Sequence, residues 1–139
     1  MIEMLGKLIA LITRRIAEME AQAQDAVTDL TMRQVFYLET IGQLDHPTHT
    51  ELAEALAVSK PTVSNMLKQL EALGYIRKAP SATDGRSFHL YLTEKGQQFS
   101  RTHEALHQQM AVYFTQNLSS EETAQLVSLL TKIVGGEVE

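Results

Sequence analysis

Apolar residues recur every three or four positions along most of this chain, which is the spacing of amphipathic helices. Residues that favour helix caps stand just before several of these apolar stripes. The pattern predicts four helices in the first half of the chain: 2–27, from Thr31 to near Gly42, from about Thr50 to 57, and from Ser59 to Leu73. In the second helix, the expected core residues are Val35, Phe36, Leu38 and Ile41.

The period of the pattern changes after the fourth helix. Residues 75–78 and 88–92 are predicted as two strands, because the second alternates between apolar and polar positions. The segment between them, PSATDGRS, is rich in turn formers, so the strands form a hairpin with a long loop. Two further helices are expected, one capped by Thr93 and reaching about Phe114, the other opening at Ser119. The predicted fold is therefore mainly α with a small β-hairpin.

Length and composition fit one globular domain and exclude several chemistries. The 139 residues are 44% apolar and 21% charged, which is ordinary for a folded domain. The absence of cysteine excludes disulfides, thiol nucleophiles and thiolate metal sites. The apolar run near the start is broken by Lys7, Arg14 and Arg15, lacks a cleavage site, and is too short to span a membrane. We therefore expect a cytoplasmic protein with no membrane partner.

Charge is distributed unevenly along the chain. The net charge is −5, but residues 59–95 hold six of the 12 basic and only three of the 17 acidic residues. That segment has a net charge of +3 and the rest of the chain −8. A basic patch on an acidic body is typical of a face that binds phosphate, although a solvated surface gives the same pattern.

The helices at 50–57 and 59–73 have the arrangement of a helix-turn-helix motif. In the second helix Val63, Leu67 and Leu70 form one inward stripe, so the opposite face is expected to point to solvent. This outward set is polar or cationic and comprises Lys60, Thr62, Ser64, Asn65 and Lys68. Such side chains can pair with adenine, contact guanine or bind phosphate. Together with the hairpin that follows, they predict DNA binding.

The same region resembles the MarR family of winged helix-turn-helix regulators. The resemblance is carried by HTELAEALAVSKPTVSNMLKQLEALGYIRK at 49–78 and DGRSFHLYLTEKG at 84–96. The family's wing motif, D-x-R, is matched by Asp84 and Arg86, and its L-T-x-x-G motif by Leu92, Thr93 and Gly96. The flanking helices also suit the layout of the family, so the resemblance spans nearly the whole chain.

This resemblance implies one MarR-like domain over residues 1–139, with a winged DNA-binding lobe at 31–93. Residues 1–30 and 94–139 would form N- and C-terminal dimerisation helices, and their long apolar stripes have little else to cover. The resemblance places the recognition helix in the major groove and Arg86 in the minor groove, with Asp84 holding Arg86 in position. The expected DNA-binding residues are Ser59, Lys60, Thr62, Ser64, Asn65, Lys68, Lys78, Asp84 and Arg86.

The function implied is that of a sequence-specific transcriptional regulator. We expect a homodimeric repressor that binds a pseudo-palindromic operator in double-stranded DNA and is released by a small-molecule effector, because family members often sense small anionic or aromatic molecules. The sequence names no effector, and Phe36, Tyr37 and Met110 suit a plain core as well as a ligand cleft. No cofactor and no catalytic residue are expected.

One motif competes with this interpretation. Residues 103–107 read H-E-A-L-H, which matches the H-E-x-x-H helix of zinc metallopeptidases. No G-x-x-H follows it. The chain is also too small to form a protease cleft in addition to a winged helix, so we expect no enzyme.

Two other readings of His103 and His107 remain. Zinc-sensing members of the MarR family use a histidine pair at about this place, which makes a zinc-responsive regulator the alternative. Their further histidine ligand aligns near Gln34 here, a poorer ligand, and Glu20, Asp25 or Glu104 are the candidates to complete a site. The default reading is a half-buried helix-face histidine. No role is assigned to the three remaining histidines, His46, His49 and His89.

Overall fold

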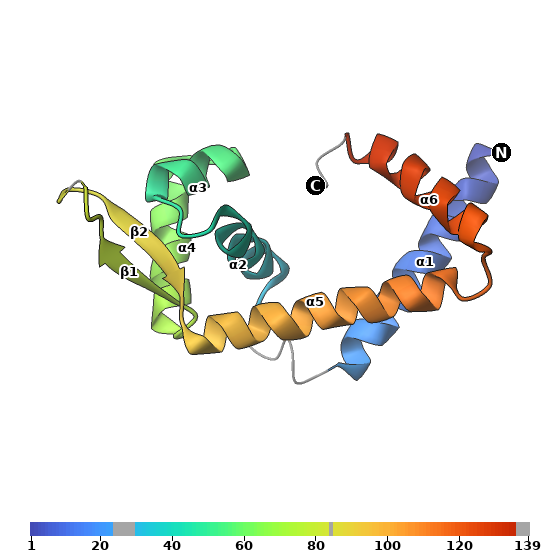
Figure 1. Ribbon diagram of the computed structural model, residues 1–139, viewed down its shortest axis with the longest axis horizontal. Helices are drawn as coiled ribbons and strands as arrows, with labels where there is room; N and C mark the ends of the chain where they lie inside the picture. Colours follow the sequence, from blue (N-terminus) through green and yellow to red (C-terminus); the bar gives the residue numbers. More distant parts are fainter. Residues whose placement is uncertain (24–29, 84, 136–139) are drawn as a thin grey trace. The chain divides into compact units, whose positions relative to one another are not determined.

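The computed structural model describes residues 1–23, 30–83 and 85–135 (Figure 1). In chain order the elements are α1 (Ile2–Gln22), α2 (Met32–Leu44), α3 (His49–Leu56), α4 (Lys60–Ala72), β1 (Ile76–Pro80), β2 (Phe88–Leu92), α5 (Glu94–Thr115) and α6 (Ser120–Ile133). The predicted order of four helices, a hairpin and two helices is confirmed. The chain divides into two compact units, one of Met1–Met19 with Ala105–Glu139 and one of Glu20–Glu104.

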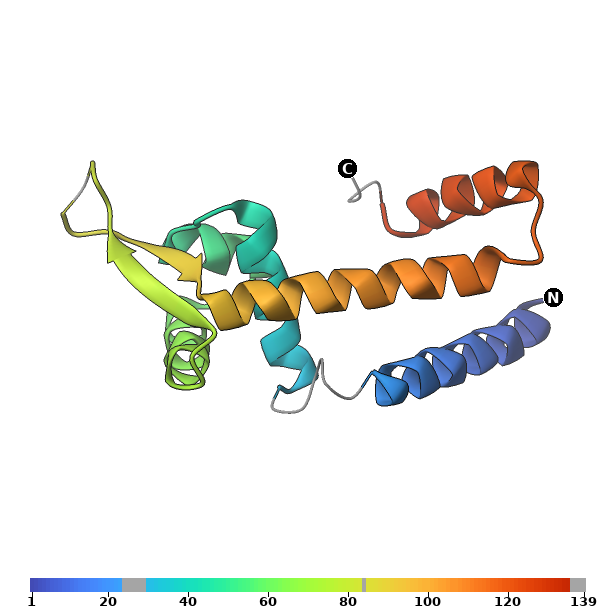
Figure 2. The ribbon, with the colours of Figure 1, turned by 60° about the horizontal axis from the view of Figure 1, so that its bottom comes forward.

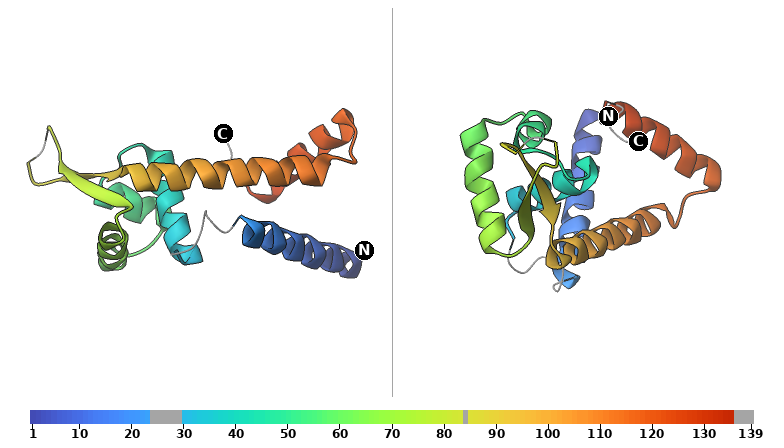
Figure 3. Two further views of the ribbon diagram at one scale, coloured as in Figure 1. Left: turned by 90° about the horizontal axis from the view of Figure 1, so that it is seen from below. Right: turned by 60° about the vertical axis from the view of Figure 1, so that its left-hand side comes forward.

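The unit Glu20–Glu104 has a continuous hydrophobic core. α3 packs against α2 and α4, and the hairpin covers the remaining side through contacts of β1 with α4 and of β2 with α2 and α3. The right-hand view of Figure 3 shows α4 at the outer side of this unit, with the hairpin beside it. Side chains less than 2% exposed include Leu38, Ile41, Leu52, Val63, Leu67, Leu70 and Leu90. The inward stripe of α4 is thereby confirmed.

Side-chain caps set several helix starts where the sequence predicts them. Thr31 caps α2 and Ser119 caps α6, each in a reciprocal capping box with the residue three positions later. Ser59 accepts a hydrogen bond from the backbone amide of Thr62 and begins α4, with Pro61 in the first turn. Thr93 accepts from the amide of Gly96 at the start of α5. These local bonds satisfy backbone amides that have no partner within the helix.

Other predicted boundaries were wrong by a few residues. α2 does not stop near Gly42 but continues to Leu44 and ends at Asp45, whose backbone is left-handed at φ 52°. α3 begins at His49, one residue before the expected Thr50, because Thr48 accepts the capping bond. α1 runs to Gln22, and residues 24–27 of the helix predicted over 2–27 lie outside the described residues.

The hairpin is antiparallel, with Ile76 opposite Leu92 and Pro80 opposite Phe88. The first strand therefore runs later than the predicted 75–78. Tyr75 instead lies buried before the strand, where its ring meets the edge of Phe99. In α2, Phe36 was expected in the core but is 52% exposed, and Tyr37 is buried in addition to Val35.

The other unit contains most of α1, the second part of α5, and α6. Figure 2 shows α6 turning back from the end of α5. Arg15 of α1 lies over the ring of Tyr113 at 4.5 Å, and its hydrogen bond to Glu18 raises the pKa of the Arg15 guanidinium. Neither α1 nor α6 has a buried residue. Among the described helices, none combines the length and apolar character needed to cross a membrane.

Candidate nucleic-acid interface

The helix-turn-helix is built from α3, the turn at residues 57–59, and α4. Ala57 ends α3 in a left-handed conformation, and its amide bonds back to the carbonyls of Ala53 and Glu54. Ser59 begins the next helix immediately afterwards. Leu52 of α3 and Leu67 of α4 are both fully buried in the core that joins the two helices. The packing of these side chains fixes which face of α4 points outward.

The outward face of α4 carries the polar residues that the sequence predicts there. Lys60, Thr62, Asn65 and Lys68 are exposed, as is the capping residue Ser59. No acidic residue occurs on α4 before Glu71. Ser64 differs from the others because it is only half-exposed. A hydrogen bond of 2.8 Å joins its Oγ to Nε2 of His49 at the start of α3.

His49 also contributes to this surface, where it was not expected. The bond between His49 and Ser64 connects residues 15 positions apart, and both side chains are partly buried. The sequence contains one signal for this bond. The first residue of a helix-turn-helix lies close to the middle of its second helix, because the two helices cross. That signal is weak without the helix boundary, which was predicted one residue too late.

The hairpin places two further cations beside α4. Lys78 lies on β1 opposite Leu90 of β2, and Arg86 lies in the loop between the strands; both are exposed. Asp84, predicted to hold Arg86, lies outside the described residues. A cavity of about 350 Å³ opens between the start of α3, α4 and the hairpin. Its polar lining consists of Thr48, His49, Thr50, Lys78, Arg86 and Ser87.

Two basic residues of the positively charged segment make contacts within the lobe instead. The Arg77 guanidinium lies over the Tyr91 ring at 4.3 Å, and His46 stacks on the same ring at 4.0 Å. Lys95 donates to the carbonyl of Leu73 and lies over the ring of Tyr75. The other four basic residues of this segment, all on α4 or the wing, are Lys60, Lys68, Lys78 and Arg86.

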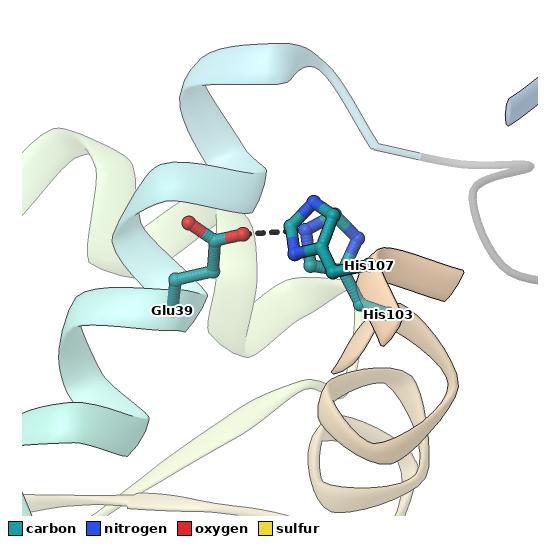
Figure 4. Close-up of side chains that lie close together, drawn as sticks. All are labelled: Glu39, His103 and His107. Atoms are coloured by element: carbon teal, nitrogen blue, oxygen red, sulfur yellow. Dashed lines mark ion pairs between the residues drawn. The ribbon is translucent and has the colours of Figure 1, made fainter. Parts of the chain in front are cut away.

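The histidine pair predicted on the helix after the wing lies on α5. His103 is half-buried, stacks on Phe99 and is paired with the carboxylate of Glu39 on α2 (Figure 4). His107 follows one turn later on the same helix and is exposed. Among the described residues, one cluster of three potential metal-ligand side chains is close enough together to hold a metal ion. It consists of Glu39, His103 and His107.

Of the residues expected to complete that group, those that the structure describes do not do so. Gln34, aligned with the further ligand of the zinc sensors, is buried and donates to Gln69, while its side-chain oxygen accepts from the amide of Thr31. Glu20 and Glu104 are not part of the group, and Asp25 lies outside the described residues. Glu39 was missed because its position opposite His103 depends on how α2 packs in the lobe.

Comparison with known proteins finds one family and several solved structures to which this chain is similar. Residues 30–88 match the MarR family. FabT of Streptococcus pneumoniae, solved in complex with DNA, is 26% identical, with a TM-score of 0.80 over 96% of this chain and 94% of its own. S. aureus MepR bound to ethidium bromide is 28% identical, with a TM-score of 0.75 over 94% of each chain.

A mutant of MarR from E. coli complexed with operator DNA is 26% identical, with a TM-score of 0.61 over 93% of this chain and 92% of its own. The likeness thus extends over both units of the chain, while the family match covers the lobe that holds α4 and most of the hairpin. The segment 30–88 thus matches the MarR family, and the fold of the chain is similar to the winged helix-turn-helix structures of FabT, MepR and MarR.

Proposed function

We propose that this chain is a sequence-specific DNA-binding repressor that acts as a homodimer and is released from its operator by a small ligand. The observation that carries the proposal is the outward face of α4, which is polar or cationic throughout and lies beside the wing cations Lys78 and Arg86. Phosphate contacts from cations give affinity, and side chains that reach base edges give specificity. This surface offers both kinds of contact.

The side chains of the surface have different roles in this proposal. Asn65 is the residue best suited to a bidentate pair with adenine in the major groove. Ser59, Thr62 and Ser64 bond bases or phosphates through their hydroxyls. Lys60, Lys68 and Lys78 contact phosphate. Arg86 enters the minor groove from the wing, and Asp84 positions Arg86.

Dimerisation belongs to the same proposal. One recognition helix with one wing covers few base pairs, so two-fold pairing on a pseudo-palindrome adds both affinity and spacing. α1 and α6 expose apolar side chains along their length, including Ile9, Leu129 and Ile133. Residues 1–30 and 94–139 act as dimerisation helices in this view, and residues 31–93 as the DNA-binding lobe. MepR, which is similar to this chain, has been solved bound to ethidium bromide, and this supports a small ligand in the proposal.

A mobility-shift assay on the DNA upstream of this chain's own gene tests the proposal. We expect binding to a duplex with half-sites about one helical turn apart. Asn65→Ala should relax base preference, at a cost of roughly 1–3 kcal/mol for a contacted pair. Lys68→Ala should weaken all sequences alike and reduce the salt dependence. Equal affinity for every duplex at physiological salt would contradict direct readout.

The pairing of Glu39 with His103 favours a second candidate, a metal-responsive regulator of the same fold. Histidines four residues apart share a helix face, and two imidazoles with a carboxylate are ligands that suit zinc. When bound, the ion would link α2 to α5 through Glu39 and His103. The H-E-x-x-H motif thus has a regulatory rather than a peptidase interpretation.

Competition for zinc against a coloured chelator tests this second candidate. We expect the wild-type chain to take up zinc and Glu39→Gln and His107→Ala to bind it more weakly, because each variant removes one ligand. His46→Asn is the matched control, since His46 is not part of this group and stacks on Tyr91. Uptake that is the same in all four proteins would eliminate this candidate.

A further inference from the structure

The bond between His49 and Ser64 ties the outward face of α4 to a titratable group. His49 Nε2 lies 2.8 Å from Ser64 Oγ, and both side chains are partly buried. His49 is the first residue of α3, whose start is fixed by the Thr48 cap. Ser64 lies between Thr62 and Asn65 in the surface proposed to contact DNA. The histidine is therefore positioned to act on DNA through a neighbouring hydroxyl.

The direction of this hydrogen bond depends on the state of the imidazole. A serine hydroxyl has one proton to donate and two lone pairs to accept with. When Nε2 carries no proton, Ser64 donates to His49 and can only accept from other groups. When the ring is protonated, Nε2–H donates to Ser64, and the hydroxyl proton is released to point elsewhere. For a neutral ring that carries its proton on Nδ1, protonation of His49 thus converts Ser64 into an outward donor.

The surroundings of His49 are cationic on the side of the hairpin. Lys78 of β1 and Arg86 of the wing loop line the same cavity as His49. His89 of β2 pairs with Thr48 through a β-bridge, and Glu51 on α3 accepts a hydrogen bond from the Thr48 hydroxyl. α4 contributes only the uncharged Leu67 to the cavity lining.

We propose that His49 is a positioning residue for Ser64, and that its protonation determines whether Ser64 offers DNA a hydrogen-bond donor or only an acceptor. This inference rests on the proposed DNA-binding function. Phosphate oxygens, guanine O6 and N7 and thymine O4 are all acceptors. Contact with any of them requires Ser64 to donate, so acidification should strengthen operator binding through His49.

Fluorescence anisotropy with a labelled operator duplex tests this, at constant ionic strength from about pH 5.5 to 8, where imidazoles ordinarily titrate. EDTA is present throughout to exclude any effect of metal ions. We expect wild-type affinity to rise about three- to tenfold for each half-site as the pH falls, the range for one hydrogen bond gained. In His49→Gln the amide can donate to Ser64 at every pH, so the affinity should remain high and most of the pH dependence should disappear.

Ser64→Ala separates positioning from simple charge. A protonated His49 also adds a positive charge near DNA, and this effect survives removal of the hydroxyl. The proposal requires most of the His49-dependent slope to vanish in Ser64→Ala; a full slope in that variant overturns it. His46→Asn is the control and should keep the wild-type profile, because His46 is exposed and its left-handed backbone tolerates asparagine.

The two proposals fail in different ways. If the wild-type chain binds no duplex specifically, the proposed function fails. If it binds its operator with an affinity that His49→Gln leaves equally dependent on pH, the function stands and the role of His49 is refuted. Thermal melting of each variant at both ends of the pH range should match the wild type, because the hydrogen bond is small compared with the core packing of α3 and α4.

Discussion

Gly96 shows how one residue joins the wing to α5. A β-carbon built at this position would lie 2.2 Å from the carbonyl oxygen of Tyr75, closer than any real contact allows. That carbonyl accepts a hydrogen bond from the amide of Thr93, so it cannot move without breaking the connection. The glycine of the L-T-x-x-G motif is therefore required by the close approach of two backbone segments.

We expect Gly96→Ala to lower the free energy of unfolding by about 1–3 kcal/mol, the usual cost of overpacking. Thermal denaturation followed by circular dichroism measures the change. Gly6→Ala is the matched control, because no atom lies within 4 Å of a β-carbon there and Gly6 sits inside α1. The control should melt at the same temperature or higher, since alanine favours the helix. Equal melting temperatures of the two variants would show that the Tyr75 backbone moves to accommodate the added β-carbon.

Arg86 carries the second prediction at this scale. Arginine is suited to the negative potential of a narrow minor groove and loses its hydration more easily than lysine. Arg86→Ala should lower operator affinity at least about tenfold, or roughly 1.4 kcal/mol. Arg86→Lys should recover part of the loss, and Asp84→Asn should cause a milder defect. Binding titrations measure these effects, and normal binding by Arg86→Ala would show that the wing makes no essential contact.

At the scale of elements, the sequence predicted what depends on neighbouring residues. The caps at Thr31, Ser59 and Ser119 were correct because each is a bond between residues three positions apart. The prediction that α2 stops near Gly42 was wrong. The helix passes through Gly42, which lies against Leu92 and Ser100, and it ends only where Asp45 turns left-handed.

The parts that sequence reasoning missed depend on packing between distant segments. His49 meets Ser64 across the helix crossing, and Glu39 meets His103 from another helix. Neither pair has a spacing that a periodicity can reveal. The exposed face of α4 could be predicted because three buried side chains on one helix determine the opposite face. The hydrogen-bond partner of Ser64, the half-exposed residue of α4, could not be predicted in this way.

The start of α4 allows its cap to be separated from its DNA contacts. Ser59→Ala should reduce stability by about 1 kcal/mol through loss of the capping bond to Thr62. Ser59→Asp keeps a good cap and suits the positive end of the helix, so it should melt like the wild type. The added negative charge should nevertheless weaken operator binding, because it faces phosphate. Melting curves and mobility shifts on the same samples provide both measurements, and unchanged affinity in Ser59→Asp would remove Ser59 from the interface.

At the scale of the whole molecule, the two units differ in how well they bury their apolar residues. The unit Glu20–Glu104 has a closed core, whereas α1 and α6 have no buried residue. Exposed large apolar side chains on these helices include Met4, Leu8, Ile12, Val127 and Leu130. Contiguous apolar surface of this kind marks an interaction site. A second copy of the chain is the partner that the proposed function requires.

The last prediction concerns that partner. Leu126 and Leu130 lie on one face of α6, and Leu130 is 49% exposed in the single chain. Replacing both by glutamate would bury two charges in an apolar interface, which costs far more than the lost apolar contact. Analytical ultracentrifugation should find a dimer for the wild type and monomers or aggregates for the double variant. Ser128→Glu is the control, because residue 128 lies on the opposite side of the helix from both leucines, and it should sediment as a dimer. A wild-type chain that remains a monomer at micromolar concentration would refute the dimer, and would leave one recognition helix to hold its operator alone.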